Sequence, residues 1–349
     1  FLDEAHNYKN IPIKTKMRDL TGINTTGSQK CLEMQRKVLC VQEQNGGRGA
    51  VFATGTPLCN SINPAAYAMQ MYLQRDKMHE LKLDIFDNWV KTFAAPEVIC
   101  EIDVDTSKFR MVRRFVKFFN LRELSKMFSS IAFFHAVEPK GLPFFNGYTD
   151  VVIKKNKPLR DYMLSLCERT ELIRAKIVDK TYDNMLKVST DGRKAALDLT
   201  LVGEKQAYNQ TSKIFRCVEN VYKIYQKYPN TSQLIFCDYS TPKSLKFDVY
   251  NKIRELLVAK GINENEIAFI HSYQTEARKL KLYEQVNSGK VRVLIGSTFK
   301  LGIGANVQTK LKAVHHLDVP WRPADVGRIL RTFKIKKNVE VTDNGKDNF

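Results

Sequence analysis

Apolar and polar positions alternate in blocks along the chain, and from about residue 208 onward the blocks predict an ordered series of elements. Short apolar runs have the length of buried strands, whereas longer amphipathic segments have the length of helices. We expect strands and helices to follow one another at 232–237 (strand), 246–260 (helix), 267–271 (strand), 275–288 (helix), 291–295 (strand) and 313–317 (strand). This alternation predicts an open, doubly wound parallel sheet flanked by helices, an α/β fold.

A second strand-to-helix pattern lies near the amino end of the chain. Residues Ala50 to Ala53 predict a short buried strand, Thr54 to Asn60 a polar turn, and a helix follows from about Asn63. A strand that ends in small polar residues and leads into a helix is a unit of a parallel sheet.

The stretch between these two regions is mostly helical in its pattern and lacks a convincing series of strands. It is broken at Gly141–Leu142–Pro143 and at Asp191–Gly192. We therefore expect three parts: the end of one α/β lobe at 1–70, a helical insertion or linker at 71–207, and a second α/β lobe at 208–349.

The charge of the chain favours a polyanionic partner. Its 56 Lys and Arg residues exceed its 37 Asp and Glu residues, which gives a formal net charge of +19. Such a field attracts nucleic acid, although a generally basic surface is the alternative explanation. The seven cysteines include no CxxC pair, so we expect neither a zinc finger nor a disulfide framework, and we expect a reducing, cytoplasmic compartment. The longest uncharged run, 49–74, contains two prolines and many polar residues, so we expect no membrane span.

Candidate chemistry begins at Asp3-Glu4-Ala5-His6. A carboxylate at the carboxyl end of a buried strand can reach a magnesium ion bound to phosphates, and a second carboxylate can orient the attacking water. Taken alone, these four residues are as well explained by a polar loop. The turn Thr54-Gly55-Thr56 after the next predicted strand adds small hydroxyls that can link such a site to neighbouring segments.

A third group of candidates lies near the carboxyl end. Gly302 and Gly304 allow the backbone to approach a phosphate or a sugar closely. Arg328 and Arg331 are three residues apart, so they share one helix face and can stabilise the charge of a transferring phosphoryl group. A cationic surface helix is the alternative explanation for this arginine pair.

The order of these motifs carries a resemblance to a known family. DEAH is followed by TGTP, then by DNMLKVSTDGRKAALD (183–198), QLIFCDYSTP (233–242), GSTFKLGIGANVQ (296–308) and WRPADVGRILR (321–331). This series resembles superfamily 2 helicases of the DEAD/DEAH-box type. Within that superfamily it is similar to Swi/Snf-like ATPases of the phage and mobile-element branch, which are often joined to an adenine-specific DNA methylase.

The resemblance implies two RecA-like lobes, ATP with Mg²⁺ as cofactors, and DNA as the partner. Asp3 and Glu4 would hold magnesium and polarise water, and His6 with the Thr54–Thr56 turn would couple the nucleotide to DNA contact. It further implies these roles: Thr54, Gly55, Thr56, Gly302, Gly304 and Asn306 on the nucleotide side or at the lobe interface, Ser297 and Thr298 on the nucleic-acid backbone, and Arg331 as the arginine finger beside Arg328. The implied activity is ATP-dependent DNA translocation or unwinding in a bacterial or phage-infected cell.

Two features depart from the family pattern. The phosphate-binding loop GxxxxGK[ST] does not occur in the 349 residues, and only two residues precede Asp3. The segment between Pro323 and Arg328 is about four residues shorter than in relatives, which would move Arg331 by about 5 Å along its helix. We therefore expect a truncated first lobe, whose missing segment or an upstream methylase domain would be a partner. The alternative function is a non-catalytic, DNA-binding remnant.

Basic segments outside these motifs are further nucleic-acid candidates. The stretch 108–126 interleaves basic and aromatic residues, so Arg113 and Arg114 are candidates for phosphate contact. Its apolar positions lie near helical spacing, which favours aromatic side chains packed in a core. Arg193 and Lys194 follow Asp191–Gly192 in a predicted turn, and either DNA contact or a plain turn explains them. His271, His315 and His316 have no ligand partners at metal spacing, so we expect core or interface histidines.

Overall fold

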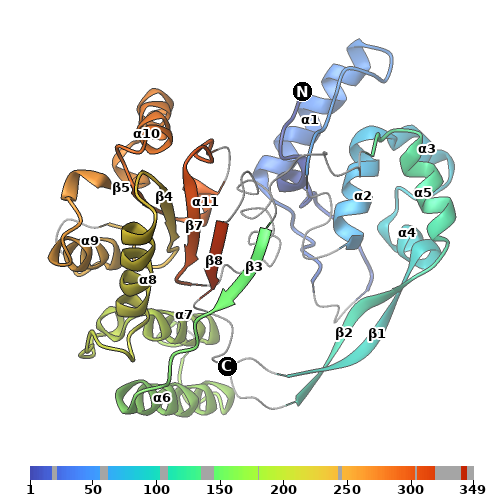
Figure 1. The fold of residues 1–349 in the computed structure, drawn as a ribbon. Helices are drawn as coiled ribbons and strands as arrows, with labels where there is room; N and C mark the ends of the chain where they lie inside the picture. The colour runs from blue at the N-terminus through green and yellow to red at the C-terminus, as the bar shows by residue number, and fades with distance from the viewer. Residues whose placement is uncertain are drawn as a thin grey trace. The chain divides into compact units, whose positions relative to one another are not determined.

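The chain forms two compact units that divide at about residue 138 (Figure 1). The computed structural model describes residues 1–17, 22–55, 62–102, 109–134, 145–179, 181–242, 246–302, 305–318 and 339–343. The domain boundaries expected at 70 and 207 remain predictions.

Helices and one two-stranded ribbon make up the first unit. Its elements, in chain order, are η1 (Ala5–Tyr8), α1 (Gln29–Gln44), α2 (Ile62–Leu73), α3 (Arg75–Glu80), α4 (Phe86–Phe93), β1 (Ala94–Ile102), β2 (Phe109–Phe118) and α5 (Leu121–Ser129). Helix α2 begins within one residue of the start that the sequence predicts.

An aromatic cluster forms the centre of the first unit. On α4, the buried residues Phe86, Trp89, Val90 and Phe93 recur at helical spacing and pack as one face. The Trp89 indole N–H donates to the side-chain oxygen of Gln70 on α2 over 2.7 Å, so the one polar atom of this ring is satisfied inside the core. Large aromatic side chains bury much apolar area, and they fix α4 against α2.

The ribbon of β1 and β2 corrects a prediction made from helical spacing. Residues 109–118 form a strand that pairs antiparallel with β1, not a helix. Phe115 and Phe118 pack against the aromatic cluster, whereas Met111 is 67% exposed. The error arises because β-branched and aromatic residues lose less side-chain freedom in a strand than in a helix. The helical expectation holds further along, where Leu124 of α5 is buried.

The second unit contains the expected parallel sheet. Its elements are β3 (Phe145–Asp150), α6 (Lys157–Arg174), α7 (Met185–Leu197), η2 (Leu199–Val202), α8 (Lys213–Lys227), β4 (Ser232–Phe236), α9 (Val249–Ala259), η3 (Glu264–Glu266), β5 (Ile267–Phe269), η4 (Ile270–Ser272), α10 (Glu276–Ser288), β6 (Val293–Gly296), α11 (Thr298–Leu301), β7 (Leu311–His316) and β8 (Val339–Asp343). The strand order is β3-β8-β7-β4-β6-β5, and every neighbouring pair is parallel. The α/β fold class is thus confirmed, and four of the six strands were predicted from apolar runs.

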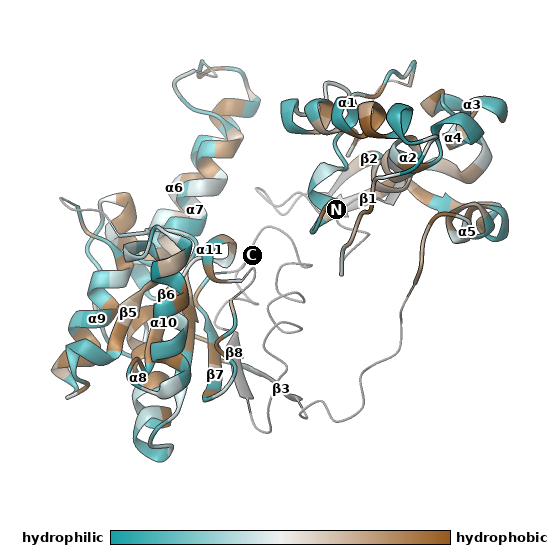
Figure 2. Cartoon of the chain, turned by 90° about the horizontal axis from the view of Figure 1, so that it is seen from above, coloured by the Kyte–Doolittle hydropathy of each residue, from teal (hydrophilic) through white to brown (hydrophobic). Residues whose placement is uncertain are grey.

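Helices cover both faces of this sheet, as its side chains show. Leu234 and Phe236 of β4 belong to a core layer that includes α10, whereas the intervening Ile235 faces a layer built by α8 and α9. All five residues of β4 are buried. A strand buried on both faces is typical of parallel sheets. Figure 2 shows hydrophobic colour on strands β5 and β7 of this sheet. Among the described residues, no helix has both the length and the hydropathy needed to cross a bilayer.

Helix α7 corrects a second prediction, the break at Asp191–Gly192. The helix runs through both residues without interruption. Gly192 is buried where α7 crosses α6, and a Cβ atom there would lie 3.3 Å from Leu166 Cδ1. The glycine therefore serves close packing of two helices and not a turn. The break expected at 141–143 lies outside the described residues.

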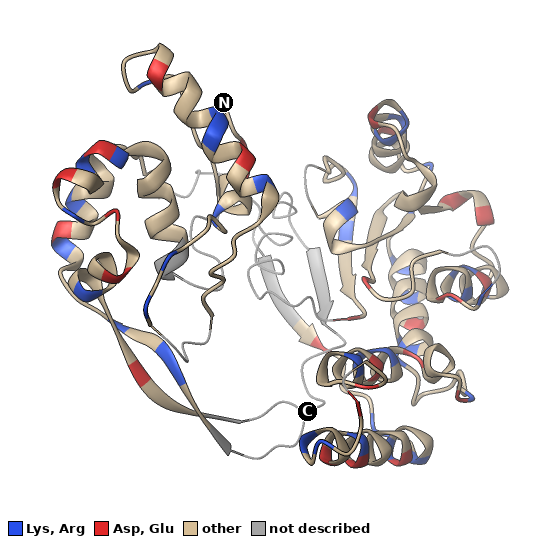
Figure 3. Cartoon of the chain, turned by 180° about the vertical axis from the view of Figure 1, so that it is seen from behind, with Lys and Arg blue, Asp and Glu red and all other residues tan. Residues whose placement is uncertain are grey.

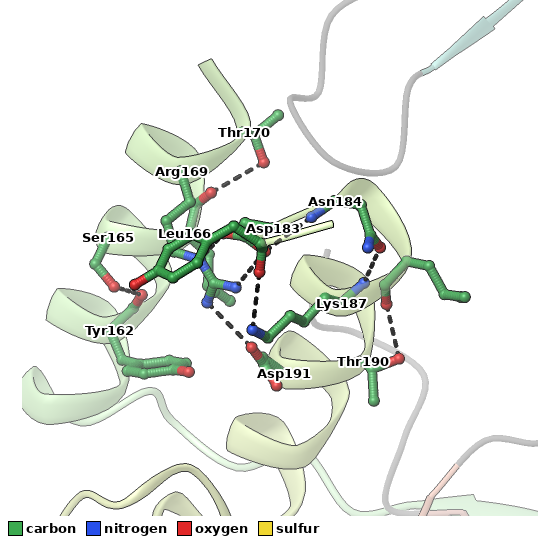
Figure 4. Close-up of polar contacts among 12 residues, drawn as sticks. Tyr162, Ser165, Leu166, Arg169, Thr170, Asp183, Asn184, Lys187, Thr190 and Asp191 are labelled. Atoms are coloured by element: carbon green, nitrogen blue, oxygen red, sulfur yellow. Dashed lines mark hydrogen bonds and ion pairs between the residues drawn. The ribbon is translucent and has the colours of Figure 1, made fainter. Parts of the chain in front are cut away.

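Arg169 ties α6 to α7 through two carboxylates (Figure 4). Its Nε and Nη2 donate to the two oxygens of Asp183 over 2.8 and 2.9 Å, and its Nη1 donates to Asp191 over 3.1 Å. The guanidinium hydrogen bonds lower the pKa of Asp183 below its ordinary value of 3.8. This bidentate pair is partly shielded from solvent, which makes it stronger than an exposed ion pair.

We predict that Arg169→Met lowers the free energy of unfolding by about 1–3 kcal/mol, because two carboxylates lose charged hydrogen bonds. Urea denaturation followed by circular dichroism measures the change, and Arg160→Met on the exposed surface of α6 is the matched control. Because the pKa of Asp183 is lowered, its contribution is present above about pH 4 and is lost as the pH falls further. Equal destabilisation by the two variants would contradict the assignment.

Candidate functional site

Two segments of the first unit run parallel at its amino end. Leu2 and Phe52 form a parallel bridge, in which the Leu2 N–H donates to Val51 O over 2.7 Å and the Ala53 N–H donates to Leu2 O over 2.8 Å. Since the chain leaves both segments at the same edge, Asp3–His6 and Thr54–Gly55 emerge side by side. The strand expected at 50–53 exists only as this bridge.

Glu4 has a backbone conformation that is uncommon for its residue type. It lies in the left-handed region, with φ 53° and ψ 43°, directly before η1. The carboxylate of Asp3 accepts a hydrogen bond from the Glu4 backbone N–H over 2.8 Å. A residue held in this region costs free energy that its surroundings must offset, and such residues concentrate at functional sites.

His6 brings the two segments together. Its ring is buried, and its Nδ1 lies 2.9 Å from Thr54 Oγ1 and 3.2 Å from Glu4 Oε2. One imidazole therefore contacts both the segment that carries the carboxylates and the turn that follows the neighbouring segment. The geometry thus brings together three residues that the sequence singled out, Glu4, His6 and Thr54. Thr56 lies outside the described residues.

The carboxylates fit one part of a magnesium–nucleotide site. Asp3 is exposed and Glu4 is partly exposed, so both oxygen donors are open to a cation that keeps several waters. No group of three His, Cys, Asp or Glu in the described ranges could hold a metal alone. A Mg²⁺ ion here would therefore take its remaining ligands from water and from phosphates. The GxxxxGK[ST] loop that binds such phosphates in P-loop NTPases does not occur in the 349 residues.

A second polar site occupies the carboxyl edge of the parallel sheet. After β6, Ser297 caps α11 and accepts from the Lys300 N–H over 3.3 Å. The Thr298 N–H donates to Asp238 Oδ1 over 2.6 Å. Asp238 lies two residues after the end of β4. Asp318, after β7, accepts from the backbone N–H groups of Asp238 and Tyr239, each over 2.8 Å. Hydrogen bonds thus connect the ends of three adjacent strands.

This arrangement changes the titration of Asp318. The pKa of its carboxyl is raised to about 6 from an ordinary 3.8, chiefly by burial and also by the nearby Asp238, while the two backbone N–H donors act in the opposite direction. Neither Asp238 nor Asp318 is among the candidates predicted from the sequence. A usable signal was present, because each is an acidic residue that directly follows a buried apolar run.

The remaining predicted residues of the second unit have mixed surroundings. Gly302 is buried after α11 with φ −78°, so the described backbone does not need glycine there for a left-handed turn. Asn306 is exposed, and its carbonyl accepts from Asn287 Nδ2 over 2.8 Å. Gly304, Arg328 and Arg331 lie outside the described residues.

The basic candidates are also placed differently from one another. Arg193 lies in α7 with its guanidinium 4.7 Å from the ring centre of Tyr239, so it contacts the carboxyl edge of the sheet. Lys194 follows it in the same helix and is partly buried. On β2, Arg113 is exposed whereas Arg114 is partly buried.

The strand histidines are core residues, as the sequence suggested. His315 is buried with Nε2 2.9 Å from Gln233 Oε1, and burial lowers its pKa to about 3. His316 stacks on Phe236 with ring centres 5.2 Å apart, and burial lowers its pKa to about 4. Both rings are therefore neutral at physiological pH.

Taken together, the parallel sheet with both faces covered, and the polar residues gathered at its carboxyl edge, define an α/β protein of the kind that binds ligands at that edge. Residues 1–136 match the model of a family described as "probable helicase domain". No curated protein matches the chain.

Several solved structures are similar to parts of the chain. The C-terminal domain of the Sulfolobus solfataricus SWI2/SNF2 ATPase is 16% identical with a TM-score of 0.42, over 57% of this chain and 78% of that domain. The Pyrococcus furiosus Hef helicase domain is 15% identical with a TM-score of 0.30, over 54% of this chain and 36% of that structure. The DUF1998 helicase MrfA bound to DNA is 10% identical with a TM-score of 0.31, over 39% of this chain and 18% of MrfA. The chain thus spans under a fifth of MrfA.

We predict that Asp318→Asn changes the pH dependence of stability. Because the native pKa is raised, ionisation of Asp318 costs the native state free energy as the pH rises from about 4 through about 6, by up to about 3 kcal/mol. As the pH rises through this interval, the free energy of unfolding of the wild type should therefore fall relative to that of the variant. Urea denaturation of both proteins at intervals from pH 4 to 7 measures it, and a difference that stays constant with pH would rule out the raised pKa.

Proposed function

We propose that the chain provides the magnesium and water carboxylates and the second lobe of an ATP-dependent DNA translocase or helicase of the Swi/Snf-like type. The observation that carries this proposal is the contact of His6 with both Thr54 and Glu4. An acidic pair alone is weak evidence for a nucleotide site. Here the buried His6 ring connects Glu4 of that pair to Thr54 in the neighbouring turn, which is the arrangement that a nucleotide-driven switch needs. The family match over 1–136 and the net charge of +19 support the same function.

In this proposal each residue has a distinct task. Asp3 would hold the magnesium ion, and Glu4 would polarise the attacking water. ATP with Mg²⁺ supplies the phosphoryl group to be transferred. A movement of Glu4 would change its contact with His6 and thereby the contact of His6 with Thr54, because both residues lie within hydrogen-bond reach of Nδ1 of His6.

The second unit supplies the nucleic-acid side and the charge stabilisation. Ser297 and Thr298 contact the DNA backbone from the carboxyl edge, and Asp238 with Asp318 fixes the turn that carries them. On the motif series alone, Arg331 and Arg328 are the candidates for charge stabilisation, and Gly304 and Asn306 are candidates for the nucleotide side. The boundaries at 70 and 207, the phage and mobile-element branch and an associated methylase domain belong to this proposal on the strength of the motif series.

A non-catalytic DNA-binding protein is the second candidate function. The 349 residues contain no GxxxxGK[ST], so this segment by itself does not supply the loop that binds the β- and γ-phosphates, while its basic charge favours DNA. The two candidates agree on DNA binding and differ in nucleotide turnover.

The shared expectation is salt-dependent DNA binding by the 349-residue chain. Its affinity for a fluorescent duplex, measured by anisotropy, should fall at least about tenfold between about 50 and 200 mM salt. Absence of binding at low salt would exclude both candidates.

The rate of ATP hydrolysis distinguishes the two candidate functions. Protein expressed from the whole native reading frame should hydrolyse ATP faster with DNA present, and Glu4→Gln should lower that rate at least about 100-fold while ATP and DNA affinities change little. Glu33→Gln on the exposed surface of α1 is the matched control. If the wild-type protein hydrolyses ATP no faster than buffer alone and still binds DNA, the non-catalytic function is the correct one.

A further inference from the structure

The ribbon of β1 and β2 has two chemically different faces. Opposite residues of an antiparallel pair share a face, and the register pairs Val98 with Arg113 and Cys100 with Met111. All four of these side chains are exposed, Val98 by 58% and Met111 by 67%. We call this set, Val98, Cys100, Met111 and Arg113, the outer face of the ribbon.

The opposite face is partly covered. It carries the pairs Ile99–Val112 and Glu97–Arg114, and all four of these residues have intermediate exposure. Glu97 also pairs with Lys117 over 2.5 Å. The acidic side chain of this part of the ribbon is therefore neutralised on the covered face, and the outer face holds a cation and no acid.

A ribbon of two strands needs a partner for its exposed apolar residues. Isolated two-stranded ribbons are marginally stable in water, and β1 and β2 pair over nine and ten residues. Contacts with the aromatic cluster come from Phe115 and Phe118 near one end. The outer face leaves Val98 and Met111 in solvent, which marks it as an interaction surface.

Charge and composition decide what kind of partner fits. The sequences of β1 and β2 contain Arg110, Arg113, Arg114 and Lys117 against Glu97 and Glu101, which is a net positive charge. Figure 3 shows basic (blue) and acidic (red) residues on the described part of the ribbon. A positive ribbon favours a polyanion. Single-strand binding relies on exposed aromatic rings as stacking platforms. Phe115 follows Arg113 on this face of β2 but packs against the aromatic cluster, and none of the four exposed residues of the outer face is aromatic. The major groove of duplex DNA admits a two-stranded ribbon, where arginine reads guanine edges and apolar side chains contact thymine methyl groups.

We propose that the outer face of the β1–β2 ribbon binds in a groove of duplex DNA, with Arg113 contacting a base edge or phosphate and Val98 and Met111 packing against the groove. This inference rests on the proposed DNA function and assigns it a surface in the first unit, separate from the Ser297–Thr298 turn. It also distinguishes two adjacent arginines, because Arg113 contacts DNA and Arg114 supports the ribbon.

Charge reversal tests the arginine. Arg113→Glu should weaken duplex binding about 10- to 100-fold and lower the slope of log affinity against log salt by about 1 or more. The control, Arg36→Glu on the exposed surface of α1, changes the net charge equally and should cost less than about threefold. If the two variants lose equal affinity while the wild type binds DNA, the ribbon assignment falls and the DNA function stands. If the wild type does not bind duplex DNA, both fall.

The uncharged residues give an independent test. The double variant Val98→Ser with Met111→Gln keeps the net charge, so it should weaken duplex binding about 3- to 10-fold without changing the salt slope. A single strand of the same length should show no such loss, and an equal loss would overturn groove binding. Unchanged duplex affinity, with self-association of the wild type that the double variant abolishes in sedimentation experiments, would instead show that the outer face binds protein.

Discussion

Parallel pairing of β4 with both of its neighbours is the constraint on which the second unit depends. β4 lies between β7 and β6, and its side chains alternate between two core layers, so no residue of the strand contacts solvent. Parallel strands also end at the same edge. The polar residues that follow β4, β6 and β7 are therefore forced into one place, whatever their own interactions. The same rule operates on a smaller scale at the Leu2–Phe52 bridge, which places His6 next to Thr54.

This convergence has an energetic cost at each site. Asp318 loses most of its hydration, and two backbone N–H groups compensate only in part, so its pKa remains raised. Glu4 adopts a left-handed backbone conformation that an unrestrained glutamate rarely takes. In both cases the surrounding structure holds a polar residue where its own preferences would not place it. That is the behaviour expected of residues kept for a task other than stability.

The two corrected elements share one physical cause. Residues 109–118 have apolar positions that suit either a helix or a strand, and pairing with β1 selected the strand. Asp191–Gly192 reads as a turn from local preferences, yet α7 continues through it because the glycine allows α6 to approach. Local preferences differ by about 1 kcal/mol or less per residue, so a packed neighbour readily outweighs them. β3 and β8 have few apolar residues, and only their sheet partners define them as strands.

The sequence by itself determined the alternation of strands and helices in the second unit, because continuous apolar runs have few other ways to be buried. It also determined the candidate carboxylates and the basic balance of the chain, since these follow from residue identity. Only the tertiary structure decided which polar residues meet. It joined His6 to Glu4 and Thr54, brought Asp318 to Asp238, and turned Arg113 and Arg114 to opposite faces of a ribbon. Contacts between residues distant in sequence depend on strand register and helix packing, and a single sequence carries no local signal for either.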